Sequence, residues 1–227
     1  MKKTVRMFSA VALVMAILIS NSTSAQKPMK MAAPKAPAVM SASALKTNMR
    51  KLWEDHIVWT RNVILCITDD LPGTDQAVKR LLQNQVDIGN AIKPYYGEEA
   101  GKKLTDLLTP HITIAAEVVK AAKTNNSAAL ADADKRWHAN ADQISEFLSI
   151  ANPHWALADM KMMMNDHLKL TTDEAVQRIK ENYDADVMAY DKVHNEILKM
   201  SDMLSDGIVK QFPDKFKAGG MPKTASK

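Results

Sequence analysis

Apolar residues recur every three or four positions through most of this 227-residue chain, which is the spacing of one face of an α-helix. The first such segment keeps this step over residues 45–66, and a turn follows at residues 71–74. One histidine stands among the apolar stepping positions, which are Leu45, Met49, Leu52, His56, Trp59, Val63 and Cys66. The segment is therefore predicted to be a long helix with one buried face.

The same spacing continues in five further segments, at about residues 77–91, 98–121, 130–148, 157–168 and 183–208. Pro110 is expected to kink the third segment, and Thr171 with Glu174 fits a capping box that would open a new helix after the short fifth one. Short connections between long amphipathic helices favour antiparallel neighbours. We predict an all-α, up-and-down antiparallel bundle of five or six helices in residues 43–217.

Three histidines recur in this helical part at an almost constant spacing of 55 and 56 residues: His56, His111 and His167. Each is followed by an arginine and, four residues later, by an asparagine; the pairs are Arg80 with Asn84, Arg136 with Asn140, and Arg178 with Asn182. Self-similarity at a fixed period indicates repeated supersecondary units. The bundle should therefore consist of repeated helical hairpins, with histidine on the first helix and asparagine on the second, and the first four helices should form a pseudo-symmetric pair.

The two ends of the chain differ from this body. Residues 1–25 combine a basic start, an apolar run at 7–19 and small residues before Gln26, which is typical of a secretory signal peptide. The apolar run is shorter than the roughly 20 residues that span a bilayer, so no transmembrane segment is expected in the mature chain. Residues 26–42, rich in Pro, Ala, Met and Lys, predict a disordered spacer, and residues 218–227 a disordered tail.

The net charge changes once this leader is set aside. The whole chain carries 30 basic and 26 acidic residues, and without residues 1–25 the balance is 27 to 26. The mature protein then has no electrostatic case for binding nucleic acid. We expect an exported protein, in the periplasm or the medium.

A polar centre is predicted where the histidines meet the second helices. If the hairpins pack by their pseudo-symmetry, imidazole, amide and carboxylate groups would converge at mid-bundle, and such ligands suit zinc, iron or copper. The candidate metal-binding residues are His56, His111, Asp87, Asn84, Asn140 and Asp142, with His167, Asp186 and His194 as secondary candidates.

Other interpretations of the same residues stay open. A buried histidine paired with an asparagine can serve helix register alone, as in a purely structural envelope protein. Methionines at residues 29, 31, 160 and 162–164 would suit Cu(I) beside imidazole. A haem could sit between a histidine and a methionine or a second histidine. A metal-dependent enzyme could use His56 and His111 as ligands, with Asp87 or Asp142 as base.

Sequence signatures of the common enzyme classes are missing. The chain contains no G-x-S-x-G, no P-loop and no G-x-G-x-x-G. We therefore expect a non-catalytic, exported bundle that binds a small ligand, a metal ion or an envelope protein.

The stretch of residues 52–97 resembles an uncharacterised family of bacterial all-helical proteins. It carries Trp53, His56, a Trp-Thr-Arg at 59–61 and the run Arg-Leu-Leu-Gln-Asn-Gln-Val-Asp-Ile-Gly-Asn at 80–90, and the resemblance continues to Gln-Phe-Pro at 211–213. Members of this family carry names such as glycosyltransferase or acetylglutamate kinase. Such activities usually use α/β folds with glycine-rich turns, which this sequence does not predict, so the resemblance implies a helical fold and little about activity.

Overall fold

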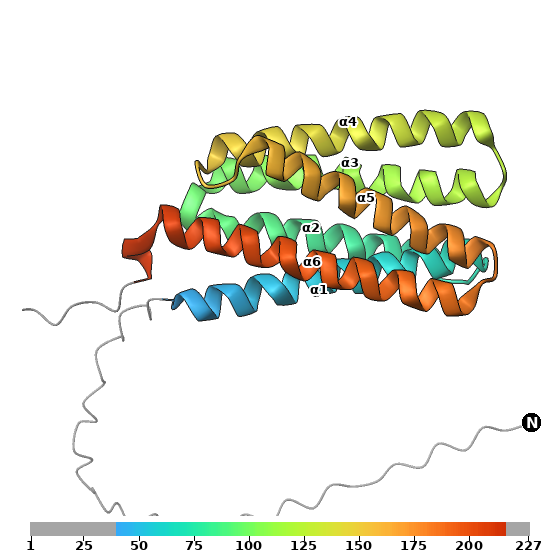
Figure 1. Cartoon of the computed structure of the whole chain (residues 1–227), viewed down its shortest axis with the longest axis horizontal. Coiled ribbons are helices and arrows are strands. Elements are labelled where there is room, and N and C mark those ends of the chain that lie inside the picture. Colours follow the sequence, from blue (N-terminus) through green and yellow to red (C-terminus); the bar gives the residue numbers. More distant parts are fainter. Residues whose placement is uncertain (1–39, 217–227) are drawn as a thin grey trace, which may run out of the picture. The chain divides into compact units, whose positions relative to one another are not determined.

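The structure, a computed structural model, describes residues 40–216, which form six α-helices and a final 3₁₀ turn (Figure 1). Connections of one to five residues join consecutive helices, which therefore run antiparallel. The prediction of an all-α, up-and-down bundle built from hairpins is confirmed. The elements are α1 (Ala42–Thr68), α2 (Thr74–Tyr96), α3 (Glu98–Lys123), α4 (Ser127–Ala151), α5 (Leu157–Ile179), α6 (Tyr183–Gln211) and η1 (Pro213–Lys215).

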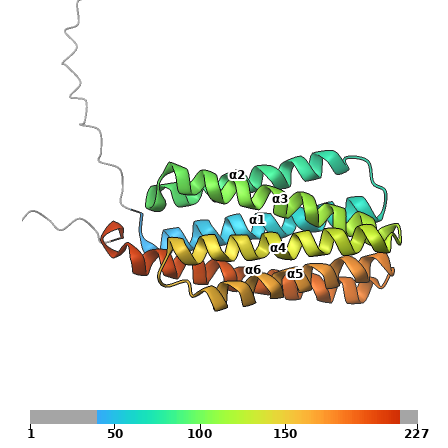
Figure 2. The same cartoon turned by 90° about the horizontal axis from the view of Figure 1, so that it is seen from above.

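Three helical hairpins make the bundle: α1 with α2, α3 with α4, and α5 with α6. Each helix also packs against the next one along the chain, and α6 packs against α1, so these contacts close a cycle around the bundle. Figure 2 shows the helices lying lengthwise beside one another. The first helices of the hairpins, α1, α3 and α5, contact one another as well. They form an inner trio, and each second helix lies in the groove between two of its members.

The hydrophobic core runs along the inner trio, between these helices and the helices packed on them. It includes Ile57 on α1 and Leu168 on α5, each 1% exposed, together with Ile197 on α6, which is fully buried. Burying an aliphatic side chain of this size contributes roughly 1.5–3 kcal/mol. The three-to-four spacing seen in the sequence is the direct cause, since it places these residues on one face of each helix.

Polar side chains and glycine set the helix ends. Ser41, Asn126 and Asn182 each accept a hydrogen bond from the backbone N–H three residues later and so cap α1, α4 and α6. Gly97, at φ +87°, is the single residue between α2 and α3. This left-handed conformation costs glycine little, which permits so short a connection.

The predicted break before Thr171 does not occur. Helix α5 runs without interruption from Leu157 to Ile179, and Thr171 and Glu174 are both buried within it. The capping-box prediction was wrong because Arg61 on α1 binds the Glu174 carboxylate at 2.7 Å. A buried acidic side chain with such a partner has no need of a free helix end.

Several predictions fall outside the described residues. The signal peptide at residues 1–25, most of the spacer at 26–42 and the tail at 218–227 lie there, although α1 already begins at Ala42.

Pro110 lies within α3, which continues on both sides of it. None of the helices in residues 40–216 is long and apolar enough to cross a membrane.

Candidate functional site

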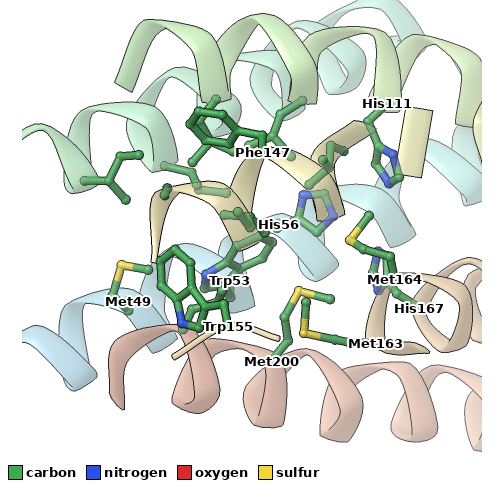
Figure 3. A pocket seen from close by; sticks show the side chains of 18 of the residues that line it. Met49, Trp53, His56, His111, Phe147, Trp155, Met163, Met164, His167 and Met200 are labelled. Carbon is green, nitrogen blue, oxygen red and sulfur yellow. The ribbon is translucent and has the colours of Figure 1, made fainter. Parts of the chain in front are cut away.

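Three buried histidines meet at the middle of the inner trio. His56 on α1, His111 on α3 and His167 on α5 are each only 3% exposed. The ring centroid of His167 lies 5.7 Å from that of His56 and 6.3 Å from that of His111 (Figure 3). The period of 55 and 56 residues thus brings three equivalent side chains from three hairpins into one layer.

Each imidazole is held at Nδ1 by a side chain 29 residues further along the chain, on the second helix of its own hairpin. His111 Nδ1 lies 2.9 Å from Asn140 Oδ1, and His167 Nδ1 lies 3.0 Å from Glu196 Oε2. Both contacts require a proton on Nδ1, because the amide and carboxylate oxygens only accept. In a neutral ring held this way, Nε2 carries the free lone pair.

The orientation of the Asn140 amide follows from a second hydrogen bond. Its Nδ2 donates to the carbonyl oxygen of Leu107, four residues before His111, at 3.0 Å. Asn84 repeats this contact by donating to the carbonyl of Leu52, four residues before His56, at 2.9 Å. Asn84 and Asn140 therefore occupy equivalent places in the first two hairpins, as the sequence repeat predicts.

The contacts around His56 differ from those of the other two rings. Its Nδ1 lies 3.2 Å from Gln85 Nε2, which also donates to the carbonyl of Leu81 at 3.2 Å. In this arrangement Nδ1 is an acceptor. Two buried amide oxygens, Asn84 Oδ1 and Gln85 Oε1, have no hydrogen-bond partner.

The surroundings keep at least two of the rings neutral. Burial lowers the pKa of His56 well below its ordinary value of 6.5, and repulsion from His167 and His111 lowers it further. Burial also lowers the pKa of His111 to about 3, against the opposing hydrogen bond to Asn140. Neutral imidazole is the form that binds metal ions.

A small apolar cavity of about 30 Å³ adjoins the histidines. Its lining includes the three rings, four aromatic side chains, and Met163, Met164 and Met200 (Figure 3). A guest the size of a water molecule needs about 10–15 Å³, whereas drug-sized ligands occupy about 300–1,000 Å³. The cavity therefore suits an ion or a very small molecule, and as it stands it is too small for haem.

A second apolar cavity, of about 80 Å³, lies on the other side of the histidine layer. Its walls include the residues one helical turn after each histidine, Thr60, Ala115 and Thr171. The histidine layer is therefore a polar partition between two apolar spaces. Such surroundings strengthen electrostatic interactions inside the layer, because water does not screen them.

The ring spacing is close to that of a three-histidine metal site but wider. Zn–N bonds of about 2.0–2.1 Å in tetrahedral geometry would put ring centroids about 5 Å apart. In residues 40–216, no group of three or more His, Cys, Asp or Glu side chains is already close enough to hold a metal ion. Binding through these rings would need them to approach by about 1 Å or to share the ion with a ligand of another kind.

The structure does not bring the candidate carboxylates to this centre. Asp87 accepts a hydrogen bond from Gln83 on its own helix, and the half-exposed Asp142 pairs with Lys161. The His194 side chain is 31% exposed, and its Nε2 lies 3.3 Å from Glu54 Oε1. Asp186 is buried, but its carboxylate binds the guanidinium of Arg61 at 2.7 and 2.9 Å.

The third predicted arginine–asparagine pair, Arg178 and Asn182, does not contact the histidine layer. Asn182 caps α6, and Arg178 pairs with Asp69 at the end of α1. The residues that hold the rings of the first and third hairpins, Gln85 and Glu196, escaped the sequence analysis. Each residue that holds a ring lies 29 residues after its histidine, and this spacing could have revealed them. It is hard to recognise in the sequence because the three residues, Gln85, Asn140 and Glu196, are of different types.

Comparison of this chain with known protein families, curated proteins and solved structures gives no match.

Proposed function

We propose that this protein is an exported, non-catalytic binding protein that holds one transition-metal ion between His56, His111 and His167. The observation that supports it best is the convergence of one buried histidine from each of three hairpins. A contact at Nδ1 with an amide or carboxylate is also how proteins orient metal-binding histidines, because it directs Nε2 toward the ion.

Unpartnered atoms favour metal binding over a purely structural hydrogen-bond network. A network that served only packing would satisfy its buried polar atoms, yet Asn84 Oδ1 and Gln85 Oε1 have no partner. A metal at His56 Nε2 would move the proton of this ring to Nδ1, which then needs an acceptor. The buried oxygen of Asn84, which has no hydrogen-bond partner, would take that role.

The size of the cavity favours binding over catalysis. A space of about 30 Å³ beside the rings leaves no room for most substrates next to an ion. The two carboxylates considered as bases, Asp87 and Asp142, have partners outside the histidine layer. A metal-dependent enzyme is therefore the weaker alternative.

Metal binding can be tested on purified protein produced from the full chain. The metal-free form would be titrated with Zn²⁺, Co²⁺ and, without oxygen, Cu⁺, and the bound metal counted after gel filtration. We expect one ion per chain, and at least a 100-fold weaker affinity in His111→Gln and His167→Gln. His194→Gln is the matched control, because His194 lies outside the layer and is partly exposed.

Two further measurements keep this test decisive. Circular dichroism and urea unfolding would show whether each variant still folds, and the visible spectrum of Co²⁺-loaded unmodified protein reports nitrogen ligation without any substitution. If no metal binds, or if His111→Gln and His167→Gln bind as well as the parent while folded, the proposal is wrong. Export would be checked by the mass of the protein recovered outside the cytoplasm, which should lack residues 1–25.

A further inference from the structure

A group of buried methionines lies beside the histidine layer. Met160, Met163 and Met164 share the inward face of α5 and are at most 8% exposed, whereas Met162 on the same helix is 60% exposed. Met163 and Met164 line the same cavity as the three imidazoles, as does Met200 from α6. In Figure 3 the side chain of Met164 extends toward the three rings.

We infer that the bound ion is Cu(I), held by the three imidazoles together with the thioether of Met164. This inference rests on the proposed function, because it names the ion for the same site. Thioether sulfur is a soft ligand that binds Cu(I) and contributes little to zinc or iron sites.

The charge of the site points to the same ion. The energy of moving an ion from water into an apolar medium grows with the square of its charge, so a divalent ion costs about four times as much as a monovalent one. Imidazole and thioether ligands bring no negative charge, the rings are 3% exposed, and one carboxylate, that of Glu196, contacts the layer through His167. A monovalent cation with that carboxylate gives a site of zero net charge, whereas a divalent ion leaves one positive charge buried.

The spacing of residues along α5 puts Met164 next to His167. Met164 lies three residues before His167, so both side chains face the same side of the helix. The corresponding positions in the other hairpins hold Trp53 and Leu108, which also line the cavity. One of three equivalent positions thus offers a donor atom, and the other two close the space around it.

The test compares Met164→Leu with Met162→Leu. Leucine keeps the volume and apolar character of methionine, so both variants should fold. Cu(I) affinity would be measured without oxygen by competition with a coloured Cu(I) chelator. We expect at least a 10-fold loss for Met164→Leu, no change for Met162→Leu, and no change in Zn²⁺ affinity for either. X-ray absorption of the Cu(I)-loaded parent should show sulfur among the nearest atoms.

The outcomes separate this inference from the proposed function. Histidine-dependent binding of Zn²⁺ or Co²⁺ together with unchanged Cu(I) affinity in Met164→Leu would overturn the copper assignment and leave the metal site standing. A Cu(I) site with nitrogen neighbours alone would overturn it too, as would tighter binding of Zn²⁺ than of Cu(I). Loss of all metal binding only in the histidine variants, with Met164→Leu specifically impaired for Cu(I), supports both.

Discussion

At the scale of single residues, the most consequential charged contact lies outside the histidine layer. Arg61 Nη1 lies 2.7 Å from both Glu174 Oε1 and Asp186 Oδ1, and both carboxylates are 1% exposed. Burial raises the pKa of Glu174 to about 7, against the opposing effect of Arg61. Asp186 has a second arginine, Arg178, at 3.6 Å, so Glu174 is the less well compensated of the two acids and is easily protonated near neutral pH.

This contact makes the stability of the metal-free protein depend on pH. Because the pKa of Glu174 is higher in the folded state than its ordinary 4.5, its contribution is fully present below pH 4.5 and is lost as the pH rises through about 7. Glu174→Gln cannot ionise, so it should gain about 1–3 kcal/mol relative to the parent between pH 5 and pH 8. Urea unfolding at both pH values measures this gain, with exposed Glu146→Gln as control. An equal difference at both pH values would contradict the prediction.

A second residue-scale prediction concerns the partner of His167. Glu196 holds Nδ1 of this ring, and loss of such an outer contact typically weakens metal affinity 10- to 100-fold. Glu196→Leu should therefore bind the ion in that range more weakly, because leucine offers no acceptor oxygen to Nδ1, and urea unfolding would check that this variant still folds. Glu54→Gln, which alters the surface contact with His194, is the control and should bind as the parent does. Equal affinities of the two variants would show that Glu196 does not orient the ring.

At the scale of elements, the approach of α2 to α3 depends on two glycines. A Cβ atom on Gly89 would lie 2.6 Å from the carbonyl oxygen of Gly101 and would also collide with Thr105 Oγ1. The first of these neighbours is backbone, so it cannot move without shifting a helix. Small residues at these two positions therefore permit the close crossing of α2 over the start of α3.

Gly89→Ala should accordingly destabilise the protein although alanine is the better helix former. The gain in helix propensity is at most about 1 kcal/mol, and overpacking typically costs about 1–3 kcal/mol, so a net loss of about 1–2 kcal/mol is expected. Asn90→Ala, at the exposed neighbouring position, brings a somewhat smaller gain in helix propensity without the clash and should be neutral or stabilising. Thermal and urea unfolding of both variants would decide; a stabilised Gly89→Ala would rule the argument out.

At the scale of the whole molecule, the proposed ion would connect three hairpins that are otherwise joined by apolar packing and by ion pairs such as those of Arg61. The inner trio of α1, α3 and α5 comes from three separate stretches of sequence, and one histidine of each meets the others in one layer. An ion bound only by the folded arrangement stabilises it by mass action. The site would then act on the stability of the entire bundle rather than on one helix.

The expected size of this effect is measurable. At a free metal concentration of 100 times Kd the gain is about 2.7 kcal/mol, which for a protein of this size raises Tm by roughly 5–11 °C. A chelator should reverse the shift, His111→Gln should abolish it, and His194→Gln should keep it. An equal shift in both histidine variants would place the stabilising ion elsewhere.

The sequence by itself determined the helices, except for the false break before Thr171, and the hairpin repeat with the inward faces of His56 and His111, because these follow from local periodicity. It paired Asn140 with His111 correctly, but in the first hairpin Gln85, and not Asn84, contacts the histidine ring. It could not decide that Glu196, and not Asn182, completes the third hairpin. That choice depends on which turn of α6 faces His167, which is a tertiary property.

Only the tertiary structure decided what surrounds the histidines. Periodicity says that a side chain faces inward, but it does not say which of five other helices it meets. For that reason α5 continues through Thr171, where Arg61 from α1 compensates Glu174, and Asp87 and Asp142 remain outside the layer that they were expected to join. The same packing puts Met164 beside three imidazoles that lie as many as 111 residues apart in the chain.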